Sequence, residues 1–370
     1  MIGKVPLKQF NNLLLCGILI CIVLYYGQAV LIPLCFSVFF AMLFTSMSNT
    51  LEGLGVRRIW TTLLSLLILV LVVAGIGLLV YVQSKKLAEE FPLIEKRSLE
   101  FIKKIEHYIS VRLDVTEKRQ EELIVEQVRS AGSSLQSIIK RLISGIAGIL
   151  GSCVLIVVFT FLFLYQREKY ESFFIQISAN TDPAEAKRVI RKVATVARCY
   201  LTGRVLSILI FTVLFTIGFL IIGLKNAFLL AFIAAFLTIV PYIGSIVGGM
   251  FPFAVALVTE DSASVAVGAL TVVLIIQMFD NYFIEPNIIG GEVNISGFFT
   301  ILILFIGGLI WGVAGMVLFL PMLGVVKVVC DEIPALKPYG YLIGDQQKEK
   351  QSTRLWNKLK KLFWKREAFK

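Results

Sequence analysis

An uncharged run of 35 residues, from Leu13 to Met47, constrains this chain more than any other feature. A membrane-spanning helix needs about 20 apolar residues, so this run is too long for one span and long enough for a tight helical hairpin. The apolar core of a cleavable signal peptide extends over only about 7–15 residues, so we interpret the run as retained membrane helices. The stretch 25–28 (Tyr-Tyr-Gly-Gln) is the predicted turn, between spans at 11–26 and 29–47.

The whole chain has the composition of a membrane protein. Of its 370 residues, 57% are apolar and 16% are charged, against about 45–50% and about 25% in ordinary soluble domains. The charges gather in the segments 83–145, 166–204 and 336–370. Basic residues outnumber acidic ones by 8 to 4 in the second segment and by 10 to 3 in the third, which predicts a cytoplasmic position for both. The net charge of +11 therefore indicates orientation and membrane lipids as partners, and not nucleic acid.

The pattern predicts an all-α polytopic membrane protein of about eight transmembrane helices. Four parts are predicted: spans one to three in 1–82, an amphipathic helical insert outside the membrane in 83–145, spans four to eight in 146–335, and a basic cytoplasmic tail in 336–370. Eight crossings place both termini in the cytoplasm, at the inner or plasma membrane of the cell. The last apolar stretch, 298–329, is expected to break near Pro321.

A strong helix start lies within the cytoplasmic part of 146–335. Asp182 is a predicted N-cap, followed by Pro183 and, three residues after the cap, Glu185. The helix predicted over about 182–202 has an apolar face and several cationic ones. We expect it to lie on the anionic inner membrane surface, separate from a fifth span at about 205–223.

The stretch 227–258 is apolar but interrupted by proline and glycine. We favour a single crossing with a broken helix, because a segment that re-enters and leaves on one face would give seven spans and an external basic tail. The residues at the break are Pro241, Tyr242, Gly244, Ser245 and Gly248. Proline and glycine there would free backbone groups inside the membrane, as at the solute and ion sites of transporters. The alternative is a proline kink with a glycine packing face.

Span seven, about 263–284, carries a polar face. Gln277, Asp280, Asn281 and Glu285 recur at helical spacing. An acidic side chain at mid-bilayer costs about 2.5–3.5 kcal/mol, so Asp280 is expected to face a cavity, a polar partner or a subunit contact. The alternative for Asp280 and Glu285 is an interfacial position. Two weaker features have structural interpretations. Lys225 and Lys327 are expected to extend their charged ends to the membrane interface. The glycines 307, 308 and 312 are expected to form a packing contact.

Soluble-enzyme motifs are missing from the sequence. It contains no GxxxxGK[ST] nucleotide-binding loop, so an ATPase and other enzyme activities are not expected. No cysteine falls in 83–145, and no cysteine pair has zinc-site spacing. We therefore expect no disulfide, metal or other cofactor.

Three stretches resemble the AI-2E family of permeases, the autoinducer-2 exporter family of bacterial membrane proteins. Residues 239–249 resemble the family's PYIGPxxG segment, and residues 280–290, including Pro286, resemble its polar segment after span seven. The third is the glycine-rich last helix ending at Pro321, and the order of spans also matches. Two departures stand out: Ser245 replaces a second proline, and Ser296-Gly297 replaces a His-Pro pair, so a proton-coupled step cannot be carried over from that histidine.

The resemblance implies a transport role, homo-oligomeric assembly, and either export of a small polar signalling molecule or Na⁺(Li⁺)/H⁺ exchange. The leading hypothesis is a permease that exports a small polar solute without its own ATPase, with Asp280 in the pathway. The second is a Na⁺(Li⁺)/H⁺ antiporter using the same carboxylate. A third is a scaffold that transports nothing, whose working part is the insert 83–145.

Overall fold

The computed structural model describes residues 7–79, 81–82, 85, 151–177, 182–241, 243–260, 263–289 and 294–345. All regular structure within these ranges is helical. Its elements are α1 (Leu7–Tyr26), α2 (Gln28–Gly53), two further helices (Arg58–Leu79 and Gly151–Tyr165), α5 (Arg167–Ile177), α6 (Pro183–Ile221), α7 (Ala227–Leu237), α8 (Ile243–Thr259), α9 (Ala263–Phe279), the π-helix η1 (Asp280–Ile289), α10 (Gly297–Glu332), the 3₁₀-helix η2 (Pro334–Leu336) and α11 (Lys337–Ile343). Apart from Lys85, the predicted insert 83–145 lies outside the described residues, as does the tail beyond residue 345.

Five described helices are long and apolar enough to cross a membrane. They are α2, Arg58–Leu79, α6, Ser264–Ile284 and α10. A sixth span results if Gly151–Tyr165 and α5, which meet at an angle of 69°, cross as one bent pair. The all-helical membrane architecture is thus confirmed, but the count of eight spans is not. At the predicted turn α1 ends at Tyr26 and α2 begins at Gln28. Gly27 nevertheless donates to the Val23 carbonyl at 2.8 Å and accepts from the Leu31 N–H at 2.9 Å, as within a helix, so the break is present but the predicted tight hairpin is not.

The chain divides into two compact units. Unit 1 comprises residues 1–65, 155–204 and 285–370, and unit 2 comprises residues 66–154 and 205–284. Helix α6 belongs to both units. Its charged first half lies in unit 1 and its apolar second half in unit 2.

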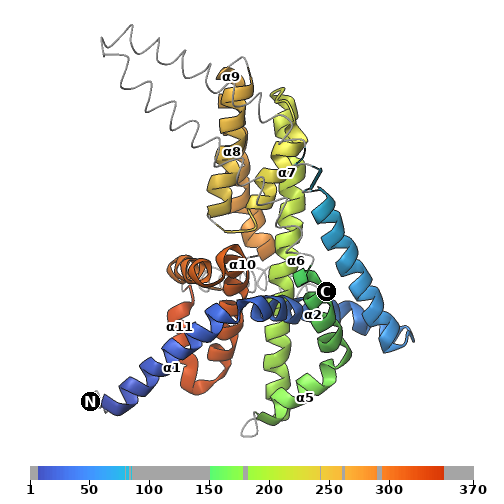
Figure 1. Ribbon diagram of the computed structural model, residues 1–370, viewed down its shortest axis with the longest axis vertical. Helices are drawn as coiled ribbons and strands as arrows, with labels where there is room; N and C mark the ends of the chain where they lie inside the picture. The colour runs from blue at the N-terminus through green and yellow to red at the C-terminus, as the bar shows by residue number, and fades with distance from the viewer. Residues whose placement is uncertain are drawn as a thin grey trace, which may run out of the picture. The chain divides into compact units, whose positions relative to one another are not determined.

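The predicted start of α6 is confirmed. The Asp182 Oδ1 atom accepts a hydrogen bond from the Ala184 backbone N–H at 3.1 Å, so the carboxylate satisfies one of the amides left unpaired at a helix start. The prediction of two separate helices is wrong, because α6 continues for 39 residues to Ile221 (Figure 1). Gly203 is the weakest helix former near the expected junction, and one glycine costs a helix only about 1 kcal/mol.

The apolar face of the first half of α6 is buried within unit 1. Ala197 joins a core cluster with Phe39 of α2 and with residues of α10, among them Trp311 and Phe319. Tyr200 joins a second cluster, which includes Ile343 of α11. The face predicted to contact the inner membrane surface is therefore covered by protein. The cationic side of the helix stays exposed.

Residues 225–260 form a closed helical hairpin in unit 2. The Lys225 backbone N–H donates to Glu260 Oε1 at 3.1 Å, and Lys225 Nζ lies 3.6 Å from Glu260 Oε2. The first and last residues of the segment thus meet, and α7 packs along α8, which in turn packs along α9 (Figure 1). The predicted single crossing is therefore wrong. A helix of 11 residues such as α7 is also only about 16 Å long, short of the about 30 Å of a bilayer core.

Helix α10 is a second hairpin, in unit 1, and it folds at Gly312. This glycine has φ 59° and ψ −139°, a conformation that side chains strongly disfavour. A Cβ built on Gly307 would lie 2.6 Å from the carbonyl oxygen of Gly315, whereas eight residues of straight helix span about 12 Å. The predicted break at Pro321 is therefore wrong, since this proline lies inside the second arm. The predicted glycine packing contact is confirmed at Gly307.

Candidate functional site

The tip of the α7–α8 hairpin contains the first predicted site. Residues 238–242 connect the two helices, and Gly244 and Gly248 are buried immediately after them. A Cβ on Gly248 would lie 2.6 Å from the carbonyl oxygen of Ala234, and one on Gly244 would overlap the Leu237 carbonyl. The glycines therefore allow the two helix backbones to touch. For Gly244 and Gly248 the structure thus agrees with the alternative interpretation, in which the glycines form a packing face.

Backbone amides at this tip are bonded, contrary to the prediction that the break frees them. The N–H groups of Thr238, Ile239 and Val240 donate to carbonyls three residues earlier, at 3.1–3.2 Å. The Gly244 N–H donates to the Val240 carbonyl at 2.9 Å. Such tight-turn bonds are the usual way in which the last turn of a helix satisfies its backbone.

The side chains at the tip are only partly covered. Pro241 and Ser245 are half-buried, and Tyr242 lies outside the described residues. Tight backbone bonding at residues 238–240 leaves the tip as a fixed turn. A solute at this tip would therefore contact the small polar side chain of Ser245, which the fixed turn holds in place.

The second predicted site is a polar cluster at the end of α9. Gln277 Nε2 lies 3.5 Å from Asp280 Oδ2 and 3.4 Å from Asn281 Oδ1, so the amide can donate to both. Gln277 and Asp280 are half-buried and Asn281 is exposed. The predicted shared face is confirmed for these three residues. A carboxylate held by an amide donor can bind a cation, a proton or a polar solute.

The helix type changes at Asp280, before the last two predicted residues. From Asp280 to Ile289 the chain is a π-helix, with hydrogen bonds to the fifth residue along in place of the fourth. The longer period takes Glu285 out of the α-helical spacing that the prediction assumed. The side chains of Glu285 and Pro286 lie outside what the structure describes.

The pairing of α8 with α9 brings the two predicted sites to one level of unit 2. A Cβ on Gly249 would lie 2.6 Å from Val273 Cγ1, which fixes the register of this antiparallel pair. Ser245 precedes Gly249 by four residues and Gln277 follows Val273 by four. Both helices advance about 1.5 Å per residue in opposite directions, so Ser245 and Gln277 lie at similar heights along the pair. The tip and the polar cluster are thus neighbours, although they are about 30 residues apart in the sequence.

Three ion-pair groups were missed by the sequence reasoning. Lys225, predicted to reach the membrane interface, closes the α7–α8 hairpin instead. Glu332, at the end of α10, accepts from Lys192 and, at 2.8 Å, from Arg188 of α6. The partners in the second group are 140 and 144 residues apart, so no local pattern could have paired them.

The third group joins the ends of three helices in unit 1. Arg167 donates to Glu52, which also accepts from the Thr61 hydroxyl at 3.1 Å. Arg58 pairs with Glu168 at 3.2 Å. These contacts connect α5 to the ends of α2 and of the helix Arg58–Leu79, so the role of this group is structural.

Metal ligands do not cluster in the part of the chain that the structure describes. No group of three or more histidine, cysteine, aspartate or glutamate side chains there could hold an ion. The six cysteines are free.

Comparison with known proteins identifies the family of the chain. The model of the AI-2E family transporter family matches residues 14–335, which include both hairpins and the α9 cluster. The chain belongs to the AI-2E transporter family. YrrI of Bacillus subtilis is 26% identical over 312 residues, which cover 82% of this chain and 86% of that protein. YueF of the same bacterium is 27% identical, over 54% of this chain and 55% of its own length.

A relative outside Bacillus is YhhT of Escherichia coli K12, which is 26% identical over 55% of this chain and 57% of its own length. All three relatives are named as candidate transport proteins. Family membership and the apolar helices together support a multi-pass membrane transporter or permease. They also agree with the expectation that the chain is not an enzyme.

Proposed function

We propose that this AI-2E family member is a permease that exports a small polar solute, autoinducer-2-like in size and polarity, along the α8–α9 pair. The observation that carries the proposal is the shared level of the hairpin tip and the Gln277–Asp280–Asn281 cluster within an apolar helix pair. Polar side chains at such a level lower the cost of moving a polar solute past apolar helices. Asp280 is the proposed solute-contacting carboxylate.

We infer from the two hairpins that fewer segments cross the membrane than the eight that the sequence predicts, with the predicted orientation kept. If 225–260 and α10 each return to the face they left, six crossings remain, and an even number keeps both termini on one side. We propose that this side is the cytoplasm of a cell with this protein in its inner or plasma membrane, because the basic segments predict it. A reporter active only in the cytoplasm, fused after residue 370, would be inactive if this orientation were wrong.

The proposed transport is tested by flux in liposomes that contain only this purified protein. Small polar metabolites are loaded inside, and their release is compared between the wild type, Asp280→Asn and the control Glu168→Gln. Glu168 is a carboxylate with 74% of its side chain exposed, and it belongs to unit 1, not to the α8–α9 pair. We expect release by the wild type and the control and none by Asp280→Asn. Equal release by all three proteins would refute the role of Asp280.

Exchange of Na⁺ or Li⁺ for H⁺ is the second candidate function. It is favoured by the half-buried position of Asp280, since a carboxylate in an apolar helix can alternate between a proton and a cation. A pH-sensitive dye inside the same liposomes reports it. Proton flux that follows added Na⁺ or Li⁺ and is lost in Asp280→Asn supports exchange over solute export. If neither flux occurs and deletion of 83–145 abolishes the cellular phenotype, the scaffold hypothesis replaces both.

We further propose that the protein assembles as a homo-oligomer in the membrane. Large apolar side chains are exposed along Arg58–Leu79 and α9, for example Leu71, Leu274 and Ile275. Lipid can cover such side chains, and so can a second copy of the chain. Native mass spectrometry from detergent separates the two cases, because a single monomer mass would refute assembly.

A further inference from the structure

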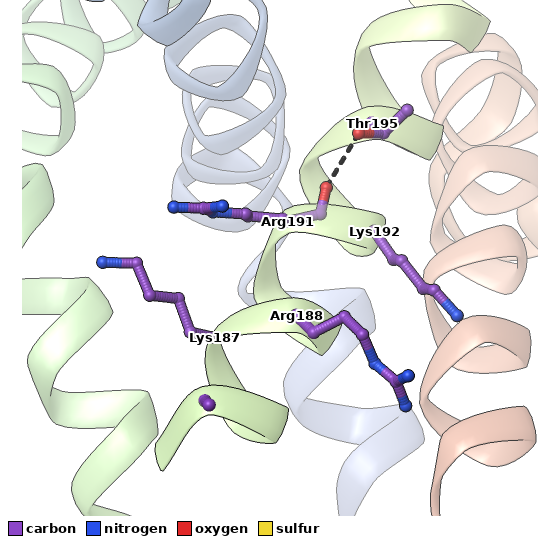
Figure 2. A pocket seen from close by; sticks show the side chains of 6 residues that line it. Lys187, Arg188, Arg191, Lys192 and Thr195 are labelled. Carbon is purple, nitrogen blue, oxygen red and sulfur yellow. Dashed lines mark hydrogen bonds between the residues drawn. The ribbon is translucent and has the colours of Figure 1, made fainter.

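A groove lined by cations lies on the first three turns of α6. It has a volume of about 430 Å³, within the range of small-molecule sites. Its lining residues are Ala184, Lys187, Arg188, Arg191, Lys192 and Thr195. Figure 2 shows Lys187 and Arg191 extending to one side of the helix and Arg188 and Lys192 to the other, so the groove lies between two rows of positive charge.

Three of the four cations are held by carboxylates and one is not. Arg188 and Lys192 pair with Glu332, and Lys187 lies 3.1 Å from Glu171. Arg191 makes no ion pair with any residue that the structure describes, and its side chain is exposed. A guanidinium offers five N–H donors in a planar fork that fits phosphate and carboxylate oxygens. Among the four cations, Arg191 therefore has the most N–H donors available to bind an anion.

Two observations favour a soluble anion over a lipid headgroup. The apolar face of this part of α6 is buried in protein at Val196, Ala197 and Tyr200, so it is not available to insert into a membrane. Arg204 is the last charged residue before the apolar half of α6, and Arg191 precedes it by 13 residues, or about 20 Å of helix. The polar zone of a bilayer is only about 5–8 Å deep on each side. The groove is thus well placed for a ligand from the aqueous phase.

We propose that this groove binds a small soluble anion that bears phosphate groups, with Arg191 as the central ligand and Lys187 beside it. Phosphate is favoured over a single carboxylate because Arg191 and Lys187 extend to the same side of the helix with several N–H donors, and each phosphate group presents three oxygens. The groove uses other residues than the proposed transport pathway, so the test of anion binding does not depend on whether the protein transports a solute. Binding there would compete with Glu332 for Arg188 and Lys192.

Calorimetric titration with inorganic pyrophosphate tests the site, using the full chain in a non-ionic detergent at low ionic strength. The variant is Arg191→Gln, and the matched control is Arg57→Gln, an exposed arginine on the same unit without an ion pair among the described residues. We expect pyrophosphate to bind the wild type and the control alike and to bind Arg191→Gln about tenfold more weakly, the usual effect of one charge-assisted hydrogen bond.

A second arm replaces pyrophosphate with phosphatidylglycerol nanodiscs. Absence of pyrophosphate binding by the wild type overturns the proposal, and so does equal binding by Arg191→Gln. If Arg191 is needed for retention of phosphatidylglycerol while pyrophosphate does not bind, the groove is a lipid site and the soluble ligand is refuted. Circular dichroism and size-exclusion chromatography of the variant establish that its fold is intact.

Discussion

Closure of the α7–α8 hairpin depends on Gly248, and replacing this glycine by alanine measures that dependence. A Cβ at this position would lie 2.6 Å from the backbone oxygen of Ala234, against about 3.4 Å for ordinary contact. The two backbones would therefore have to separate by about 0.8 Å. Overpacking of this kind costs about 1–3 kcal/mol.

The matched control is Gly75→Ala, in the helix Arg58–Leu79. A Cβ there meets no heavy atom within 4 Å. Both substitutions add one methyl group to a helix and gain the same helix propensity, about 1 kcal/mol, so their difference isolates the packing cost. The apparent melting temperature in detergent, measured by size-exclusion chromatography after heating, is expected to be about 2–6 °C lower for Gly248→Ala than for Gly75→Ala. Equal melting temperatures would refute the backbone contact and with it the hairpin packing.

Two further predictions concern unit 1. Glu332→Gln removes both ion pairs of Glu332, and because Arg188 and Lys192 are about half exposed, solvent screening limits the loss of stability to at most about 1 kcal/mol. At low salt the melting temperature should fall more for this variant than for Glu168→Gln. A difference in melting temperature between the two variants that persists in 1 M NaCl would contradict an ionic origin. Trp311→Phe removes the hydrogen bond that the indole N–H donates to the Leu24 carbonyl at 2.8 Å and should cost about 1 kcal/mol. Trp60→Phe, at a side chain that is 63% exposed, is its control, and an equal loss in both variants would show that the bond contributes nothing.

Local signals in the sequence were reliable where the physics is local. The break at Gly27 follows from the length of one apolar run, although it is not the tight hairpin turn expected, and the start of α6 follows from Asp182 and Pro183. The contact of Gln277 with Asp280 and Asn281 follows from α-helical spacing within one turn. The place of Glu285 stays a prediction, because its side chain lies outside what the structure describes; the change of helix type at Asp280 has no sign in the residue spacing.

The candidate site was therefore predictable in its residues but not in its geometry. The sequence identified the proline and glycine break and the polar face of α9 as separate features. Their common level depends on the contact of Gly249 with Val273, which joins two helices through side-chain packing. The ion pairs of Glu332 and the basic groove on α6 depend likewise on partners far apart in the chain.

By itself, the sequence determined that this protein is an all-helical membrane protein, because apolar run length and charge distribution are properties of composition and order. The AI-2E family was indicated by the resemblance of three short stretches and is shown by the family match. Only the tertiary structure decided whether an apolar segment runs straight on or folds back on itself. A run that is apolar on all sides gives the same signal whether it crosses once or doubles back, and a proline or glycine break permits both. The contact of Lys225 with Glu260 and the approach of Gly307 to Gly315 select the folded-back form in each hairpin. The apolar face of α6 poses the same ambiguity, because lipid and protein both cover apolar surface, and packing against α2 and α10 resolves it.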